Sequence, residues 1–283
     1  MKEHGGTASA VIRGFLFQRL TARVFGADPE GWLLKGGQAL LVRYPSRARL
    51  SKDIDLQHLG GDPDEALTAL VKAATTDLGD HLNFVPRQVT RHGTDTEGVN
   101  QSFDVFVGVR KFDTIHVDLV TGRTVTAPPQ TVQLEPRPGL PWPTDWPVIK
   151  LYPVVDHLAD KVCAMYEWRN ENPSSRFRDL ADILLISQNE TIEAGEAHHA
   201  LQAEAAARHA RSSGVDLRLP TRFEMPHPSW RAGYAKAAKD VAGLSGCGDW
   251  EAAHEAADRF VTPLLGSAFH GTWNPAGPGW NPN

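Results

Sequence analysis

The sequence has few cysteines, no long apolar run and no strong excess of charge of either sign. Only two cysteines occur among its 283 residues, and neither Cys163 nor Cys247 lies in a Cys-x-x-Cys pair. This argues against a disulfide framework and against zinc bound by thiolates. No apolar stretch approaches the roughly 20 residues of a membrane-spanning helix, and the first residues lack the pattern of a signal peptide. We therefore expect a soluble, cytoplasmic protein with no membrane association and with two inert thiols.

The formal net charge of −5 gives no global sign of a nucleic-acid-binding protein. Any RNA contact must then use a local patch of cations. Two clusters qualify, and they consist of Arg43, Arg47, Arg49 and Lys52 and of Arg169, Arg176 and Arg178. From these, the candidate RNA-binding residues are Arg43, Arg47, Arg176 and Arg178. Solvated surface arginines are common, and that alternative stays open for each cluster.

Apolar periodicity predicts an N-terminal domain in which helices alternate with strands. Residues 7–26 and 63–78 repeat their apolar side chains at helical spacing, and 32–43 has the pattern of a strand, a glycine turn and a helix. Strand patterns follow at 50–56, 83–89, 101–109 and 114–120, with a hairpin connection expected at 110–113. The pattern predicts an α/β (or α+β) core over residues 1–125.

Proline is dense between residues 126 and 153, which argues against a helix interior or a central strand there. We expect this segment to be an extended crossing between two parts of the chain. Beyond it, helical patterns cover 155–169, 175–188, 192–212, 230–244 and 249–265. The sequence thus predicts a helical domain over residues 154–270, and an irregular tail over 271–283 that is rich in glycine, proline and asparagine.

The sharpest chemical feature is the pair Asp53 and Asp55, placed in a predicted strand. Residues two apart in a strand project from the same face, so both carboxylates should point one way while Ile54 and Leu56 face the core. Two neighbouring carboxylates repel each other unless a cation lies between them. Mg²⁺ takes one or two carboxylates together with substrate phosphates, so the pair predicts a divalent-cation site.

Gly36 and Gly37 precede a predicted helix. Without side chains at this turn, backbone N–H groups at the helix N-terminus can approach a phosphate. Phosphoryl and nucleotidyl transfer depend on positioning and on neutralising charge. A carboxylate pair following a glycine turn in one compact stretch therefore points to transfer from a nucleoside triphosphate.

Asp118 is a candidate third carboxylate. In the strand pattern of 114–120, Ile115, Val117 and Leu119 alternate with His116 and Asp118. The polar face either adds a metal ligand or belongs to a solvated edge strand, and both interpretations stay open.

Four short motifs resemble the AbiEii family of nucleotidyltransferases, toxin components of bacterial toxin–antitoxin and phage-abortive systems that include the mycobacterial MenT toxins. The motifs occur in the family's order: Lys-Gly-Gly-Gln-Ala-Leu at 35–40, Arg-Leu-Ser-Lys-Asp-Ile-Asp at 49–55, Asp-Lys-Val-Cys-Ala-Met at 160–165 and Arg-Asp-Leu-Ala-Asp-Ile at 178–183. The resemblance implies a polymerase β-like nucleotidyltransferase core with a mixed sheet, and a helical C-terminal domain that completes the active site.

The resemblance also assigns residues. It implies that Asp53, Asp55, Lys161 and Asp182 are catalytic, with Asp53 and Asp55 binding Mg²⁺ or Mn²⁺ and Lys161 contacting the nucleoside triphosphate. The expected nucleotide-binding residues are Lys35, Gly36, Gly37, Arg49, Ser51, Lys52 and Asp179. Asp179 and Asp182 lie three residues apart on one predicted helix and share a face, from which they could hold Lys161. A purely structural salt bridge of Lys161 is the alternative.

The implied activity is addition of nucleotides to the 3′ acceptor end of tRNA, and the implied partner is a cognate antitoxin. If that antitoxin is kinase-like, Ser51 is a candidate for regulatory phosphorylation, because a phosphate beside Asp53 would repel the triphosphate. Two alternatives stay open: the acceptor is a protein hydroxyl or a small molecule, or the chain is an inactive homologue that binds a partner. A histidine-based metallohydrolase is disfavoured, because the twelve histidines include no His-x-x-x-His or His-Glu-x-x-His pair.

Overall fold

The computed structural model describes residues 8–91, 98–137, 139, 141–210, 215–277 and 279–281. Some positions of the predicted elements lie outside the described residues. They are Thr7, Arg211, Ser212 and positions 278, 282 and 283 of the predicted tail. The chain forms two compact units: unit 1 is Met1–Ser46, Leu50–Thr124 and Pro129–Tyr152, and unit 2 is Arg47–Arg49, Val125–Pro128 and Pro153–Asn283. Across the described ranges, no helix is long and apolar enough to cross a membrane.

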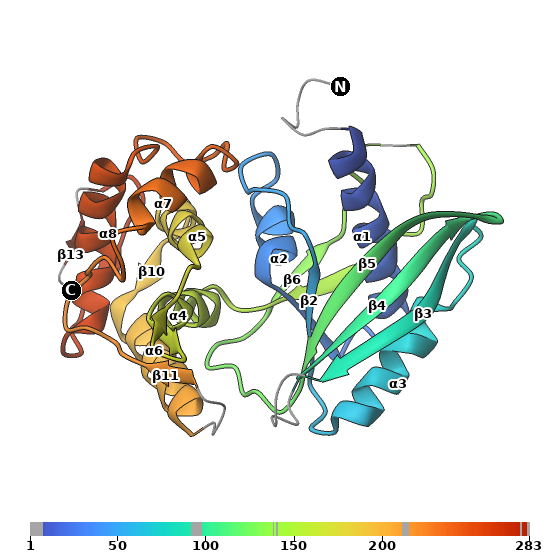
Figure 1. The fold of residues 1–283 in the computed structure, drawn as a ribbon, viewed down its shortest axis with the longest axis horizontal. Helices are drawn as coiled ribbons and strands as arrows, with labels where there is room; N and C mark the ends of the chain where they lie inside the picture. The colour runs from blue at the N-terminus through green and yellow to red at the C-terminus, as the bar shows by residue number, and fades with distance from the viewer. Residues whose placement is uncertain are drawn as a thin grey trace. The chain divides into compact units, whose positions relative to one another are not determined.

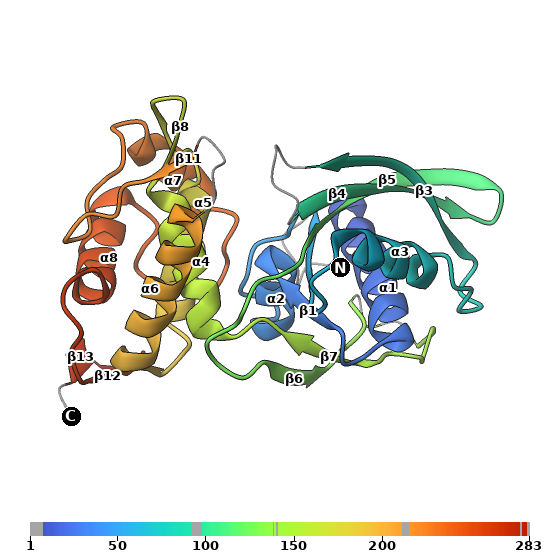
Figure 2. The same ribbon diagram turned by 90° about the horizontal axis from the view of Figure 1, so that it is seen from below.

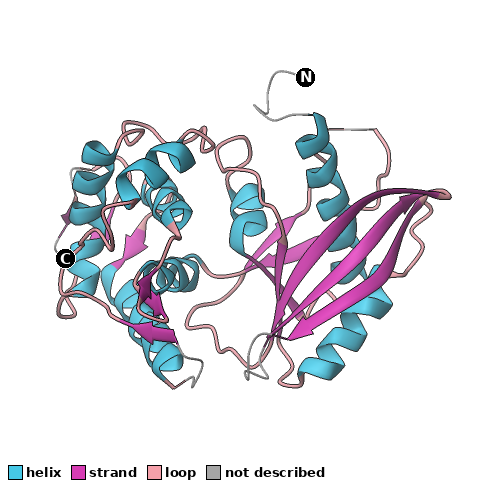
Figure 3. Cartoon of the chain, in the orientation of Figure 1, coloured by secondary structure: helices cyan, strands magenta, loops and turns pink. Residues whose placement is uncertain are grey.

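Unit 1 is built on a seven-stranded mixed sheet, visible in Figures 1 and 3. Its strands follow the order β3-β4-β5-β2-β1-β7-β6, where β2 runs parallel to β5, β1 runs parallel to β7 and the other pairs are antiparallel. The bounds are β1 (Trp32–Lys35), β2 (Ile54–His58), β3 (Leu82–Arg91), β4 (Gly98–Val107), β5 (Arg110–Val120), β6 (Gln130–Gln133) and β7 (Val148–Leu151).

Three helices accompany the sheet: α1 (Ala8–Ala27), α2 (Gly36–Arg43) and α3 (Pro63–Ala74). Figures 1 and 2 show α1 and α3 side by side against the sheet. The strand alternation predicted from the sequence is confirmed, since Ile54, Leu56 and Val117 are fully buried in the core. The start of α3 is fixed locally, because the Asp62 side chain accepts hydrogen bonds from the amides of Asp64 and Glu65 at 2.7 and 3.1 Å.

The prediction of an extended crossing at 126–153 is wrong for two stretches of it. Residues 130–133 form the edge strand β6, and residues 148–151 form β7, which lies between β6 and β1 inside the sheet. All of the segment's prolines fall outside these two strands, so none removes a hydrogen bond from the ladder. Unit 1 accordingly extends to Tyr152, apart from 125–128 and 47–49.

Two other predicted boundaries shift. The β4–β5 hairpin turns at Gly108 and Val109, and residues 110–113, predicted as the connection, already belong to β5. Gly108 adopts a φ of +58°, a conformation that glycine allows without strain and that permits the shorter turn. Strand β2 begins at Ile54, so Asp53 lies directly before the strand and not within it.

Unit 2 is helical, as predicted. Its helices are α4 (Val154–Met165), α5 (Phe177–Ser187), α6 (Ala194–His209), α7 (Trp230–Ala238) and α8 (Trp250–Leu265). One small sheet contains β8 (Glu167–Arg169), β9 (Asn172–Pro173) and β11 (Val215–Leu217), and another contains β10 (Ile192–Glu193), β12 (Thr272–Trp273) and β13 (Trp280–Asn281). Helix α4 is shorter than predicted because the chain turns into β8 after Met165.

The C-terminal tail is laid over the helices of unit 2. The indole Nε1 of Trp273 donates to the carbonyl oxygen of Ser187 at 2.7 Å, and that of Trp280 donates to the carbonyl oxygen of Phe260 at 3.0 Å. The rings of Phe260 and Trp280 stack with centroids 5.7 Å apart. The expectation of an irregular tail is therefore wrong at β12 and β13, where paired tryptophans order the chain.

Candidate active site

Four polar residues of unit 1 share one register level on neighbouring strands. Asp55 of β2 is the partner of Lys35 on β1 and of Asp118 on β5, and Asp118 is in turn the partner of Asn100 on β4. Register partners project from the same face of a sheet, on strands about 4.8 Å apart. We call Lys35, Asp55, Asp118 and Asn100 the polar row. It places two carboxylates next to each other between a cation and an amide.

The sequence predicted three of these residues and missed Asn100. The Asn100 side chain donates a hydrogen bond of 2.6 Å from Nδ2 to Oδ1 of Asp118, which fixes the orientation of that carboxylate. Asn100 is followed by two more polar residues, Gln101 and Ser102, so no spacing motif distinguishes it. Its position becomes visible only through the pairing of β4 with β5.

Asp53 and Ser51 lie just before β2. The Ser51 hydroxyl is 3.4 Å from Oδ1 of Asp53, a weak hydrogen bond at the limit of the accepted range. Both residues are partly exposed, and Lys52 between them is exposed. Because Asp53 precedes the strand, strand alternation alone does not set its direction relative to Asp55.

The aliphatic part of Lys35 is buried and its ammonium lies over an aromatic ring. Only 6% of the residue is exposed, and Nζ is 4.0 Å from the centroid of the Tyr152 ring. The negative face of the ring stabilises the ammonium. Tyr152, the last residue of unit 1, is therefore a second contributor that the sequence did not indicate.

Gly36 begins α2 with a φ of +56° and faces Asp55. A Cβ atom at this position would come within 1.8 Å of Oδ2 of Asp55, far inside contact distance. Both the backbone conformation and the space therefore require glycine. The glycine turn was predicted to admit a phosphate to the helix N-terminus, and the structure adds that Gly36 leaves room for a carboxylate of the polar row.

The polar row fits a divalent cation with few protein ligands. Among the described residues, no group of three or more His, Cys, Asp or Glu is arranged to hold a metal ion. Asp55 and Asp118 are two adjacent carboxylates, and Mg²⁺ commonly takes one or two carboxylates and completes its shell with water and phosphate oxygens. The donor set therefore suits a cation that arrives with a triphosphate.

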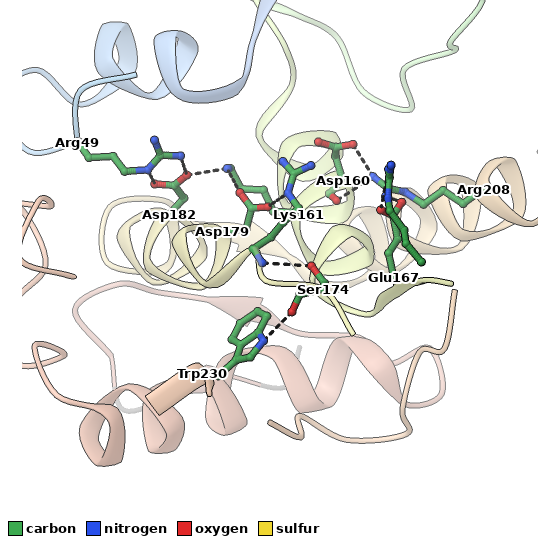
Figure 4. Close-up of polar contacts among 11 residues, drawn as sticks. Arg49, Asp160, Lys161, Glu167, Ser174, Asp179, Asp182, Arg208 and Trp230 are labelled. Carbon is green, nitrogen blue, oxygen red and sulfur yellow. Dashed lines mark hydrogen bonds and ion pairs between the residues drawn. The ribbon is translucent and has the colours of Figure 1, made fainter. Parts of the chain in front are cut away.

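Unit 2 holds a separate buried network of ion pairs, shown in Figure 4. Lys161 on α4 donates from Nζ to Asp179 at 2.9 Å and to Asp182 at 2.7 Å, both on α5. The three side chains are 5%, 4% and 0% exposed. We call Arg49, Lys161, Arg176, Asp179 and Asp182 the ion-pair network. The prediction that Asp179 and Asp182 share a face and hold Lys161 is confirmed by these contacts.

Two arginines close the network at its ends. Arg49 makes a bidentate pair with Asp182, with Nε at 3.1 Å and Nη2 at 2.8 Å, and Arg176 donates from Nε to Asp179 at 2.6 Å. Three cations thus surround two carboxylates, which leaves a net charge of +1. Each of the two buried carboxylates is thereby paired with two cations, which offsets the cost of burying a charge.

The pKa shifts follow from this arrangement. Burial opposes the charged form of Lys161 most strongly, but Asp179 and Asp182 outweigh it, so its pKa is raised. Burial likewise opposes the charge on Asp179, and Lys161 and Arg176 outweigh it, so its pKa is lowered. The pairing therefore favours the charged forms of both Lys161 and Asp179.

The remaining predicted cations differ in how far they are engaged. Arg43 donates to Gln130 and to the carbonyl oxygen of Tyr152, and Arg47 donates to Asn189. Arg178 is partly exposed and has no hydrogen bond or ion pair within the described part of the chain. Of the candidate RNA-binding residues, Arg178 is therefore the one whose side chain has no polar partner among the described residues.

A further cation of unit 2 with several carboxylate partners was not predicted. Arg208 on α6 binds Asp160 at 2.7 Å and Glu167 (Figure 4), and it also binds Glu204 at 2.7 Å. Cys163 lies in the same helix as Asp160, and burial raises the pKa of its thiol. Both cysteines are free and buried, in agreement with the prediction of inert thiols.

An α/β unit with this polar row, followed by a helical unit, matches one class of protein, the nucleotidyltransferase toxins. The family model of the AbiEii nucleotidyl transferase toxin of Type IV toxin–antitoxin systems covers residues 18–256. The chain therefore belongs to the AbiEii family. Family membership makes the protein a nucleotidyltransferase, with a nucleoside triphosphate as substrate and an antitoxin as counterpart.

One solved structure with a similar fold is a nucleotidyltransferase toxin. MenT4, a nucleotidyltransferase toxin from Mycobacterium tuberculosis, is 17% identical with a TM-score of 0.54, over 89% of this chain and 90% of that one. JHP933 from Helicobacter pylori is 11% identical with a TM-score of 0.43, over 88% of this chain and 94% of that one. No curated protein matches the chain.

Proposed function

We propose that the protein transfers a nucleoside monophosphate from a nucleoside triphosphate to the 3′ end of tRNA, in a reaction that depends on Mg²⁺ or Mn²⁺. The observation that carries the proposal is the pairing of Asp55 with Asp118 on one face of the sheet, with Lys35 in the same row. In the proposal, Asp53, Asp55 and Asp118 hold the cation, which would neutralise the developing charge on the triphosphate. Lys35 and the amides of Gly36 and Gly37 contact phosphate oxygens.

The reaction balances as a displacement at phosphorus. The 3′-hydroxyl oxygen of the acceptor forms a bond to the α-phosphorus, and the bond from that phosphorus to the bridging oxygen breaks. Pyrophosphate leaves with the electron pair, and the hydroxyl proton is released to solvent. No covalent bond to the protein is required, so positioning and charge account for the catalysis.

We propose that residues of the ion-pair network act in the same reaction. Lys161 uses two of its three N–H donors on Asp179 and Asp182. The third donor is proposed to contact the triphosphate, with Asp182 and Asp179 orienting the lysine. Arg49, Ser51 and Lys52 are proposed as further nucleotide contacts, since Ser51 and Lys52 immediately precede Asp53 in the chain.

The acceptor has a second candidate, a protein hydroxyl or a small molecule. The net charge of −5 disfavours a polyanionic acceptor. In addition, Arg43, Arg47 and Arg176 each donate at least one hydrogen bond to another group of the protein itself. The labelling experiment below therefore distinguishes an RNA acceptor from a non-RNA acceptor.

The test incubates the purified protein with total tRNA, Mg²⁺ and each α-labelled nucleoside triphosphate in turn. Asp55→Asn is compared with the matched control Asp104→Asn, which changes a carboxylate on β4 outside the polar row. We expect label on tRNA from the wild type and the control, and at least about 100-fold less from Asp55→Asn. Full activity of Asp55→Asn would overturn the proposed site. If label appears on protein, resists ribonuclease and is absent from tRNA, the acceptor is a protein hydroxyl and not tRNA.

A further inference from the structure

Residues 47–49 belong to unit 2, although their chain neighbours Ser46 and Leu50 belong to unit 1. We call these three residues the inserted segment. It ends at Arg49, two residues before Ser51 and four before Asp53. Whatever fixes this segment in unit 2 therefore fixes one end of the stretch that carries a proposed metal ligand.

Three contacts hold the inserted segment. The amide of Gly243 donates to the carbonyl oxygen of Arg47 at 2.9 Å, and the Arg47 guanidinium donates to Oδ1 of Asn189. Asn189 is itself fixed, since its Nδ2 donates to the carbonyl oxygen of Leu185 at 2.6 Å. The third contact is the bidentate pair of Arg49 with Asp182.

Gly243 is required for space. A Cβ atom at this position would lie 2.4 Å from Cβ of Arg47, 3.0 Å from its Cα and 2.9 Å from Cδ1 of Leu185. Carbon atoms at 2.4 Å overlap strongly, and the Arg47 atoms involved belong to the main chain and its first side-chain carbon, which cannot swing aside. Any larger residue at 243 must therefore push the inserted segment away from position 243.

We propose that Gly243 and Asn189 are positioning residues for nucleotidyl transfer. They hold the inserted segment so that Arg49 stays on Asp182, and they thereby restrain one end of the chain that continues directly into Ser51, Lys52 and Asp53. The role of Asp53 rests on the proposed function, whereas the seating of the segment rests on the contacts alone. Displacement of a reacting group by about 1 Å can cost about 100-fold in rate, so small changes at Gly243 have a large effect.

The first test follows the segment itself by limited trypsin digestion. Arg49 is a trypsin site whose side chain is only 14% exposed while it is paired with Asp182. We expect Gly243→Ala to accelerate cleavage after Arg49 at least about tenfold, because release of the segment exposes the bond. The matched control is Gly271→Ala, which places a Cβ 2.8 Å from the carbonyl oxygen of Asn281 in the tail and does not touch the segment.

The second test uses a suppressor. Gly243→Ala combined with Arg47→Gly removes the Cβ–Cβ overlap, and we expect this double variant to behave like Arg47→Gly alone. Gly243→Ala combined with Arg47→Ala keeps the overlap and should stay impaired relative to Arg47→Ala. Equal behaviour of the two double variants would overturn the steric argument. Asn189→Ala, which removes the two side-chain hydrogen bonds of Asn189 without adding atoms, is the second variant to be used if Gly243→Ala does not fold.

The third test measures function. Binding of fluorescently labelled ATP, CTP, GTP and UTP with Mg²⁺, and the Mg²⁺ midpoint of labelled-nucleotide transfer, are compared across the same variants. We expect the midpoint for Gly243→Ala and Asn189→Ala to rise about tenfold or more while that of Gly271→Ala stays unchanged, since a loss of folded protein lowers the amplitude only. If trypsin shows that the inserted segment is released but the Mg²⁺ midpoint of transfer is unchanged, Gly243 and Asn189 have no positioning role. If instead Asp53→Asn retains full nucleotide binding and transfer, the proposed role of Asp53 as a metal ligand fails and the trypsin result still stands. If the wild type transfers no nucleotide, the proposed function fails.

Discussion

Nζ of Lys161 lies 2.7 Å from Oδ2 of Asp182, the carboxylate that also receives both hydrogen bonds of Arg49. A single buried aspartate thereby connects α4, α5 and the inserted segment of unit 2. Because Asp182 is 0% exposed, it depends on both cations for its solvation. Removing either partner leaves the carboxylate short of charge compensation.

Lys161→Met tests this dependence. Methionine keeps the apolar stem but removes the charge, so Asp179 and Asp182 lose their shared cation. We expect the free energy of unfolding to fall by about 3–5 kcal/mol at pH 7, measured by urea denaturation.

The same variant tests the pH dependence of stability. The pKa of Lys161 is raised in the folded state, so the stability that Lys161 contributes is present below its pKa in the unfolded chain and is lost as pH rises through its pKa in the folded protein. The variant should therefore lack the alkaline loss of stability that we expect for the wild type. A fall in the free energy of unfolding of less than about 1 kcal/mol would contradict a buried ion pair between Lys161 and the two aspartates.

Gly36→Ala tests the space around the polar row. The substitution puts a Cβ into the Asp55 carboxylate and strains a backbone with a φ of +56°. We expect nucleotidyl transfer to fall at least about 100-fold, measured with the labelled triphosphates described above. Gly14→Ala is the control, because a Cβ there has no neighbour within 4 Å and the residue lies inside α1. Near-normal transfer by Gly36→Ala would show that the Asp55 carboxylate is not needed where the structure places it.

The sequence was informative where a local period decides the structure. Alternation in β2 and β5 predicted that Ile54, Leu56 and Val117 face the core and that Asp55 and Asp118 do not, and both strands follow it. The spacing of Asp179 and Asp182 on a helix predicted a shared face in the same way. These inferences need only the geometry of one element.

Features that depend on contacts between distant elements were not predictable in this way. Asn100 enters the polar row only because β4 pairs with β5 in one register, and Arg208 binds carboxylates from three separate places in the sequence. The strand β7 was missed because prolines flank it, and local composition does not reveal that they lie outside the ladder. The docking of residues 47–49 into unit 2 has no local signature at all, since a loop carries no period.

Acid stability depends on Asp80, which joins α1 to the start of β3. Burial opposes its charge most strongly, but hydrogen bonds from Arg23 and Arg19 outweigh it and lower its pKa to about 2. A lowered pKa stabilises the fold above the unfolded value near 3.8, and the stabilisation is lost as pH falls toward about 2. We expect the free energy of unfolding to drop by about 2 kcal/mol across that window, and Asp80→Asn to abolish this dependence. If the free energy of unfolding of Asp80→Asn falls at low pH as much as that of the wild type, groups other than Asp80 cause the pH dependence.

Phosphorylation of Ser51 would place two negative charges beside Asp53, whose Oδ1 is 3.4 Å from the Ser51 hydroxyl. Those charges repel an incoming triphosphate, so we expect co-expression with a kinase-like antitoxin to yield an inactive protein carrying phosphate at Ser51, detected by mass spectrometry. Ser51→Glu should lower transfer about tenfold or more, whereas Ser51→Ala should lower it less, because it removes one hydroxyl contact and adds no charge. A neutralised toxin with unmodified Ser51, or a fully active Ser51→Glu, would rule out this form of control.

Arg178 offers the most direct test of an RNA acceptor. It is partly exposed at the start of α5 and pairs with no carboxylate of the described chain, so its charge is available to a phosphate. If tRNA is bound there, Arg178→Ala should weaken tRNA binding and reduce the slope of log affinity against log salt by about 1. Lys236→Ala, an exposed cation on α7, is the control. Arg176→Ala differs in kind, because it removes a partner of Asp179 and should lower stability as well. If the slope of log affinity against log salt is the same for the wild type and Arg178→Ala, Arg178 does not contact the acceptor. That result would favour the second candidate, a protein hydroxyl or a small molecule.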